Sequence, residues 1–250
     1  MNQYRSSFLD SIPPVVKNLI IINILFWLAS ITLPRLVGVD VSYWLGLHYW
    51  QASDFHLFQF VTYMFLHSLF SPGHLFFNMF GLFIFGRVLE YTWGSKRFLI
   101  YYMVTGIGAG IVKQIVWTID LYPIYREVAN LAGSELQRGV NVGGHIIYST
   151  NDLFMLFNRF LTVGASGAIF GLLLAFGMMF PNQPLYIMFI PIPIKAKYLV
   201  IGYAVIELFM GVGNFQFDNI AHFAHLGGML FGYFLIRKWR RDASNNQMFG

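Results

Sequence analysis

Long apolar stretches separated by short polar segments run through most of the chain. A helix needs roughly 20 apolar residues to cross a hydrocarbon core about 30 Å thick, and six stretches approach that length. They lie at residues 18–33, 73–88, 98–117, 163–180, 196–212 and 220–236. Pro34 and Arg35 close the first stretch, and Pro181 closes the fourth. The pattern predicts an all-α, polytopic membrane protein built as a bundle of six transmembrane helices.

The segments between these stretches differ in character. Residues 36–72 mix tryptophan, tyrosine and histidine with aspartate, which favours an interfacial loop with short helices. Residues 119–162 form a long polar insert, in which the apolar residues 153–161 suit the membrane interface. Residues 184–193 form an apolar link interrupted by prolines.

Composition supports a membrane protein. Hydrophobic residues make up 57% of the chain and charged residues 11%, with a mean hydropathy of +0.59, which is far from the balance of a soluble domain. The absence of cysteine excludes disulfides, thiolate nucleophiles and sulfur-ligated metal sites. We expect one membrane domain over residues 1–250, with a helical core over about 18–239 and no removable signal peptide.

The net charge of +5 indicates orientation rather than nucleic-acid binding, because the basic residues gather beside alternate loops. Eleven fall on one side: Arg5, Lys17, Arg87, Lys96, Arg97, Lys195, Lys197, Arg237, Lys238, Arg240 and Arg241. Five fall on the other: Arg35, Lys113, Arg126, Arg138 and Arg159. Positive-inside asymmetry then predicts that both termini are cytoplasmic and that the insert at 119–162 is extracytoplasmic. We expect the membrane to be the cell (inner, cytoplasmic) membrane.

With this orientation, the second, fourth and sixth spans begin near the outer leaflet, and polar side chains lie in their first turns. His74 and Asn78, four residues apart, share one helix face. Ser166 stands next to glycine, and His222 and His225, three apart, share another face. Polar groups at membrane depth are costly, so their convergence predicts a functional site.

A structural interpretation of the same residues has to be considered. A lone serine in a transmembrane helix most often serves close packing. Gly167 and Gly171 have GxxxG spacing, and Gly228 and Gly232 repeat it beside the second histidine of the sixth span. Close approach of the fourth and sixth spans is therefore expected, and it would bring an imidazole within hydrogen-bonding reach of Ser166.

Close approach of the fourth and sixth spans would allow nucleophilic catalysis by the serine. A serine hydroxyl needs a neutral imidazole to take its proton, and His225 can do so. Asp218 lies in a loop and Glu207 in the middle of the fifth span, so we expect no carboxylate beside His225 and a Ser-His dyad. Histidine and asparagine side chains of the second span, together with the Ser166 backbone N–H, are available as oxyanion donors.

Three ordered motifs carry a resemblance to a known family. They are His74-Leu-Phe-Phe-Asn78, Gly164-Ala165-Ser166-Gly167 and Ala224-His225-Leu-Gly-Gly228, the last followed by Gly232. In this order, and on these spans, they resemble the motifs of the rhomboid intramembrane proteases, and Glu90 with Gly94-Ser95 resembles the family pattern as well.

The resemblance implies a serine endopeptidase that cleaves transmembrane protein substrates within the lipid bilayer, without metal or organic cofactor. Ser166 would be the nucleophile and His225 the general base. His74, Asn78, Gly164 and Ala165 would lie on the oxyanion and substrate side, with His222, Phe170, Gly167 and Gly228 in supporting positions. Substrates would enter laterally, between the second and fifth spans.

Two features depart from the family pattern. Phe170, one turn after the serine, stands where many relatives have a tyrosine, so it can stack on an imidazole but cannot hydrogen-bond to it. The insert at 119–162 is longer than in compact members of the family, and its role is open.

Three alternative functions remain open from the residues alone. His67, His74, His222 and His225 could hold a metal or haem at one depth. Glu207 and Lys113 could couple ion transport, although no inverted repeat is detectable. A non-catalytic protein could also use the same groove to bind membrane helices. The metal interpretation gives no task to the serine or its glycines, whereas proteolysis uses them all.

Overall fold

The computed structural model describes residues 11–130, 139–142, 144–186, 192–213 and 219–248. Its helices are α1 (Pro14–Val37), α2 (Val41–Leu45), α3 (Gln59–Thr62), η2 (Tyr63–Phe65), α4 (Pro72–Gly81), η3 (Leu82–Gly86), α5 (Arg87–Trp93), α6 (Ser95–Asn130), α8 (Thr150–Phe157), α9 (Ser166–Met179), α10 (Ala196–Val212) and α11 (Asn219–Met248). Its strands form three antiparallel pairs: β1 (Leu47–His48) with β4 (Leu161–Thr162), β2 (Val140–Val142) with β3 (His145–Ile147), and β5 (Pro184–Tyr186) with β6 (Pro193–Lys195).

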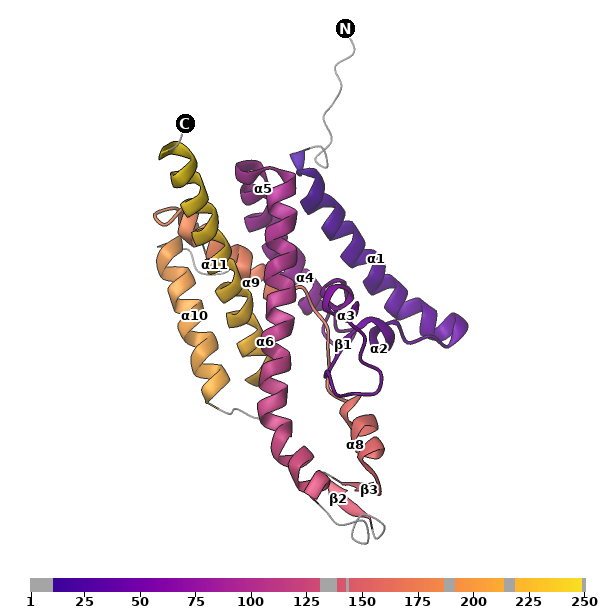
Figure 1. The fold of residues 1–250 in the computed structure, drawn as a ribbon. Helices are drawn as coiled ribbons and strands as arrows, with labels where there is room; N and C mark the ends of the chain where they lie inside the picture. The colour runs from indigo at the N-terminus through magenta and orange to yellow at the C-terminus, as the bar shows by residue number, and fades with distance from the viewer. Residues whose placement is uncertain (1–10, 131–138, 143, 187–191, 214–218, 249–250) are drawn as a thin grey trace.

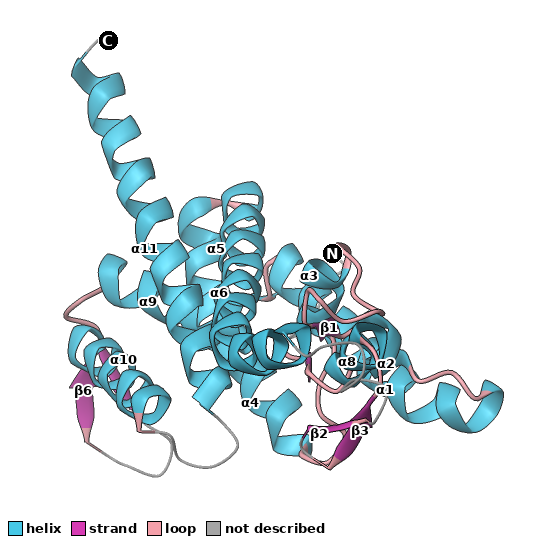
Figure 2. Cartoon of the chain, turned by 60° about the horizontal axis from the view of Figure 1, so that its bottom comes forward, coloured by secondary structure: helices cyan, strands magenta, loops and turns pink. Residues whose placement is uncertain are grey.

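Three helices form the centre of the bundle. α6, α9 and α11 pack against one another, with α1 on one side of them and α10 on the other (Figures 1 and 2). The start of α1, all of α5 and the end of α11 lie at one end of the molecule, and α8 and the β2–β3 hairpin lie at the opposite end (Figure 1). The all-α membrane-bundle prediction is confirmed, and the short strand pairs only join helices.

Within the described residues, three helical segments are long and apolar enough to cross a membrane. They are α1, the continuous segment Pro72–Trp93 and α6. α9 is apolar but has only 14 residues, so it is about 21 Å long and shorter than a hydrocarbon core of about 30 Å. A helix of this length that reaches one membrane surface begins well below the other.

Glycines allow the central helices to approach closely. A β-carbon added to Gly228 of α11 would lie 1.9 Å from the backbone oxygen of Gly167 on α9. The expected contact between these two helices is therefore present at this pair. The other two glycines of the paired motifs face α6 instead: Gly171 lies against Thr105, and Gly232 against Thr105 and the Tyr101 hydroxyl. The two GxxxG motifs therefore mark a junction of three helices, α6, α9 and α11, rather than a contact between α9 and α11 alone.

Several predicted boundaries were wrong. The first span was expected over 18–33 and closed by Pro34, but α1 runs from Pro14 to Val37 with Pro34 inside it, and α11 continues past the expected end at 236 to Met248. The third span was expected to end at residue 117, but α6 continues to Asn130, and the second span runs from Pro72 to Trp93 through the π-helical turn η3. The extension of α6 has a physical cause, because its buried side chains form a second apolar cluster with the loop after β1 and with α8. That cluster contains Tyr49, Ala52, Trp117, Leu121, Val128, Ile147, Leu153 and Phe157. Much of the predicted polar insert is therefore helix with a buried apolar face.

Glu90 joins the first two spans at the end of the bundle where α1 begins. Its buried carboxylate accepts hydrogen bonds from the backbone N–H groups of Val15 and Val16, at 3.0 and 2.8 Å, and from the Ser95 hydroxyl at 2.7 Å. The first N–H groups of a helix have no partner within the helix, and Pro13 at the N-cap supplies no side-chain acceptor. A negative charge at this position also complements the helix dipole.

Replacing Glu90 by glutamine is expected to lower the free energy of unfolding by about 2 kcal/mol or more. The amide presents only one acceptor oxygen and loses the charge, and hydrogen bonds to charged groups contribute about 1.5–3 kcal/mol each. The measurement is thermal unfolding in detergent at a fixed scan rate, with the exposed Glu127→Gln variant as the matched control. Equal transition temperatures for the two variants would show that Glu90 does not stabilise the start of α1.

Candidate active site

Ser166 is the first residue of α9, where an extended segment turns sharply into the helix. The segment is held in place on its approach, since β4 pairs with β1 and the Gly164 N–H donates to the Tyr63 carbonyl at 2.9 Å. Gly164 has a φ of +135°, which residues with a β-carbon rarely adopt. Ala165 is fully buried behind the serine, and its carbonyl accepts the Ile169 N–H. The turn therefore fixes where the hydroxyl points.

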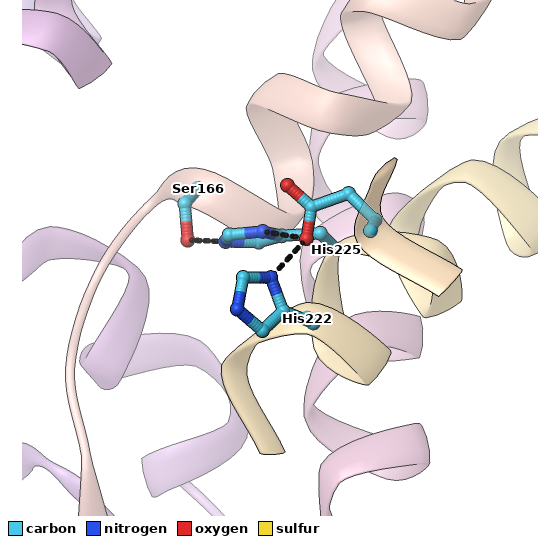
Figure 3. A network of polar contacts seen from close by, with 4 residues as sticks. Ser166, His222 and His225 are labelled. Carbon is cyan, nitrogen blue, oxygen red and sulfur yellow. Dashed lines mark hydrogen bonds and ion pairs between the residues drawn. The ribbon is translucent and has the colours of Figure 1, made fainter. Parts of the chain in front are cut away.

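The structure joins Ser166 to His225 of α11. His225 Nε2 lies 2.9 Å from Ser166 Oγ, and its Nδ1 lies 3.0 Å from Glu207 Oε2 on α10. Figure 3 shows this chain of contacts, with the His225 ring between the hydroxyl and the carboxylate. Three helices each contribute one member. The serine and histidine are 59 residues apart in the chain, and close packing of α9 on α11 brings them together.

The expectation that no carboxylate lies beside His225 was wrong. Glu207 is in the middle of an apolar helix, as expected, but the helix turns it inward, where it is only 7% exposed. A lone carboxylate in a span signals a buried partner. Periodicity within α10 could not say which neighbouring helix it would face. Asp218, the other carboxylate considered, lies outside the described residues.

His222 and Phe170 complete the surroundings of His225. His222 Nδ1 lies 2.7 Å from the same Glu207 oxygen, so the two imidazoles of α11 share one acceptor (Figure 3). Phe170 stacks on the His225 ring with centroids 4.1 Å apart and an interplanar angle of 8°. The stacking expected of Phe170 is present, and it restricts rotation of the imidazole.

His74 of α4 lies beside Gly164, two residues before the serine. The Ser68 N–H is 3.4 Å from His74 Nδ1, so Nδ1 is the acceptor and the ring proton is on Nε2. A β-carbon added to Gly164 would lie 3.0 Å from His74 Nε2 and 3.8 Å from Ser166 Oγ. The missing side chain of Gly164 therefore leaves space between the imidazole and the hydroxyl. His67 packs edge-on against His74, and burial, with a smaller effect of His74, lowers the pKa of His67 to about 3.

Asn78 does not line the space between His74 and the Ser166 hydroxyl. Its side-chain N–H donates to the backbone carbonyl of His74, one turn earlier in α4, at 2.7 Å. It is buried, but it is not among the residues that line the cavity at the serine. Its predicted role as an oxyanion donor stays a prediction.

A cavity of about 570 Å³ opens in front of the serine. Among its lining residues are His74, Gly164, Gly167 and His225, together with Lys113 of α6. From the sequence, Lys113 was a candidate for ion coupling but not for this cavity. Its ammonium group lies 2.9 Å from the Thr162 hydroxyl and 5.2 Å from the centre of the Trp117 ring, so it holds β4 against α6.

The four histidines proposed as metal ligands do not form one cluster. Among the described residues, the group of possible ligands that lies within 4.8 Å is Glu207, His222 and His225. His67 and His74 form a separate pair, with ring centroids 5.1 Å apart. In the Glu207 group, the two nitrogen–oxygen distances of 2.7 and 3.0 Å are those of hydrogen bonds between the side chains.

Comparison with known proteins agrees with the motifs. A family model described as the Rhomboid domain matches residues 54–122 and 128–241, which cover more than half of the chain and all three motifs. The chain is also similar to the chloroplastic Rhomboid-like protein 11 of Arabidopsis thaliana, with 26% identity over 236 residues. The similarity covers 86% of this chain but only 64% of the length of that relative.

Proposed function

Since the chain belongs to the rhomboid family, a family of multi-pass membrane proteins, we propose that it is an intramembrane serine endopeptidase that cleaves transmembrane segments of other membrane proteins. The observation that carries the proposal is the 2.9 Å contact between Ser166 Oγ and His225 Nε2 at the edge of a cavity. A serine that served only packing would need neither an aligned imidazole nor an open space in front of it.

In the proposed reaction, Ser166 Oγ attacks the carbonyl carbon of the scissile peptide bond while His225 Nε2 takes the hydroxyl proton. The tetrahedral intermediate collapses, the C–N bond breaks, and His225 gives its proton to the leaving amine. Water then attacks the acyl-serine ester, again with His225 as base, and releases the carboxylic acid and the free serine. No metal or organic cofactor takes part.

The negative oxygen of the intermediate requires donors on the side away from His225. We assign this task to His74 Nε2–H and the Ser166 backbone N–H, because the space left by Gly164 lies between His74 Nε2 and the Ser166 hydroxyl. One such donor is typically worth about 10²–10³ in rate. The requirement for glycine at position 164 thus has a chemical reason in addition to its φ.

A second, mostly apolar cavity of about 730 Å³ supports lateral entry of a substrate helix. It is lined by residues of α4 and η3, of α9, and of β5 and α10. Phe170 lines this cavity and stacks on His225, so the cavity and the proposed catalytic imidazole share this ring as a neighbour. Helical backbone hydrogen bonds shield carbonyl groups, so the entering segment must unwind locally, and small residues at the cleavage site favour this.

The proposal includes an orientation in the cell membrane. Both termini face the cytoplasm, where the eleven basic residues lie, and the site faces the extracytoplasmic side, as does the insert at 119–162. The short α9 then places Ser166 below the outer surface, at a depth that water reaches through polar side chains of the cavity. Residues 1–250 act in this proposal as one membrane domain.

Covalent labelling tests the proposed nucleophile. A fluorophosphonate probe is expected to label the purified protein at Ser166, found by mass spectrometry, because only a serine with an adjacent base attacks such a phosphorus centre readily. Labelling should disappear in His225→Ala and persist in Ser68→Ala, which removes another serine hydroxyl of the same cavity. Equal labelling of the His225→Ala variant and the unchanged protein would contradict the proposal.

A further inference from the structure

Glu207 is a buried carboxylate with two imidazole partners. Both Nδ1 atoms, of His222 and of His225, approach the same oxygen, Oε2, at 2.7 and 3.0 Å. They are the titratable groups in contact with it among the described residues, and both belong to α11. A buried carboxylate is costly unless it is hydrogen-bonded, so the two contacts account for its presence in the middle of α10.

The contact with Glu207 determines which nitrogen of His225 carries the proton. An ionised carboxylate only accepts hydrogen bonds, so Nδ1 must be the donor. In the neutral ring, Nε2 then has a lone pair, and this is the nitrogen that lies 2.9 Å from Ser166 Oγ. The opposite tautomer would present an N–H to the serine and could not take its proton. Phe170, stacked at 4.1 Å, holds the ring in the plane that joins the two contacts.

We propose that Glu207 is a positioning residue that fixes the tautomer and orientation of His225 and stabilises the imidazolium formed when Ser166 attacks. The inference rests on the proposed function. It extends the dyad to a chain of three side chains on three helices, α9, α11 and α10. The base is then competent only while α10 is packed against α11.

His222 has a different task in this arrangement. Its Nδ1 contacts the same oxygen at 2.7 Å, and it has no place in the proposed proton transfer. Its hydrogen bond helps to keep the carboxylate ionised and in place, so its removal should weaken the arrangement without destroying it. His222 is therefore the natural comparison for Glu207, because it contacts the same carboxylate oxygen as His225 does.

A metal ion is the competing occupant of these three side chains. An ion bound to His225 through Nδ1 would leave the proton on Nε2, so His225 could not act as the base for Ser166. The observed nitrogen–oxygen distances of 2.7 and 3.0 Å are those of direct hydrogen bonds. The geometry favours the carboxylate–imidazole contact, and metal content is one of the outcomes below.

The test compares Glu207→Gln, Glu207→Asp and His222→Phe in liposomes containing a transmembrane test substrate. For Glu207→Gln, kcat is expected to fall by about 10²-fold or more with little change in KM, because a neutral amide does not select the tautomer. Glu207→Asp should recover part of kcat, because a carboxylate can again accept the hydrogen bond from His225 Nδ1. His222→Phe should retain kcat within about fivefold.

Several outcomes would overturn the inference. They are a Glu207→Gln variant with unchanged kcat, a Glu207→Asp variant that recovers no more kcat than Glu207→Gln, or stoichiometric metal in the purified protein that both Glu207→Gln and His222→Phe lose. Failure of the proposed function is distinguishable, because Ser166→Ala would then cleave as fast as the unchanged protein. If the inference alone fails, Ser166→Ala is inactive and Glu207→Gln is not impaired in the expected way.

Discussion

Ser166→Ala and His225→Ala are each expected to lower cleavage of a transmembrane substrate by about 10⁴-fold or more, to the background rate. Each variant removes one partner of the 2.9 Å contact on which the proposed proton transfer depends. Because the two groups act as one unit, the double variant should lose no more activity than either single variant. The measurement is product formation, followed by gel and mass spectrometry, after reconstitution into liposomes.

Two controls separate chemistry from folding in this experiment. His145→Ala removes a histidine of the β2–β3 hairpin, at the end of the molecule away from α5, and should cleave normally (Figure 1). Thermal transitions of both site variants are measured as well, because His225→Ala also removes a hydrogen-bond partner of buried Glu207. Cleavage is compared at a temperature well below the transition of each variant, so that a lost activity reports chemistry rather than unfolding. Normal cleavage by either site variant would refute the Ser-His mechanism, and normal cleavage by both would refute serine proteolysis altogether.

Gly228→Ala is expected to separate the serine from its base without touching either. The added carbon would lie 1.9 Å from the Gly167 oxygen and 2.7 Å from the Gly167 carbonyl carbon, which are backbone atoms of α9. Backbone cannot rotate away as a side chain can, so α9 and α11 must move apart. Overpacking typically costs about 1–3 kcal/mol, and we expect the upper end of that range together with loss of cleavage and of fluorophosphonate labelling.

Gly202→Ala is the matched control for this prediction. A β-carbon at Gly202 of α10 meets nothing within 4 Å, so the substitution should be neutral or slightly stabilising, by up to about 1 kcal/mol. Thermal transitions in detergent and labelling of Ser166 are measured for both variants. If Gly228→Ala matches Gly202→Ala in both measurements, the close approach of α9 to α11 is not what aligns the site.

The membrane class and the central pair of side chains could be predicted from local patterns. Apolar runs of membrane-spanning length indicate helices because an unpaired backbone polar group is too costly in hydrocarbon. Ser166 and His225 were identifiable because polar groups in such runs need a reason to be there. Family membership then followed from three motifs in order, and the family match supports it.

The features that could not be predicted from the sequence depend on contacts between segments that are far apart in the chain. α6 was predicted to end near Trp117, where apolar periodicity weakens, but contacts with α8 and the loop after β1 keep it helical to Asn130. The glycine pairs indicated close packing, yet the spacing cannot say that Gly171 and Gly232 face α6 rather than each other. Periodicity gives the face of a helix, and the identity of the neighbour depends on how the whole bundle packs.

Glu207 shows most clearly the difference between what the sequence determines and what the tertiary structure decides. The sequence by itself determined that the chain is a helical membrane protein and that a serine and a histidine on separate spans lie at one depth, because both properties follow from hydropathy and helical period. Only the tertiary structure decided that Glu207 of α10 meets His222 and His225, at 2.7 and 3.0 Å. The physical reason is that the rotation and tilt of α10 against α11 depend on side-chain packing along their whole length, which no local pattern encodes.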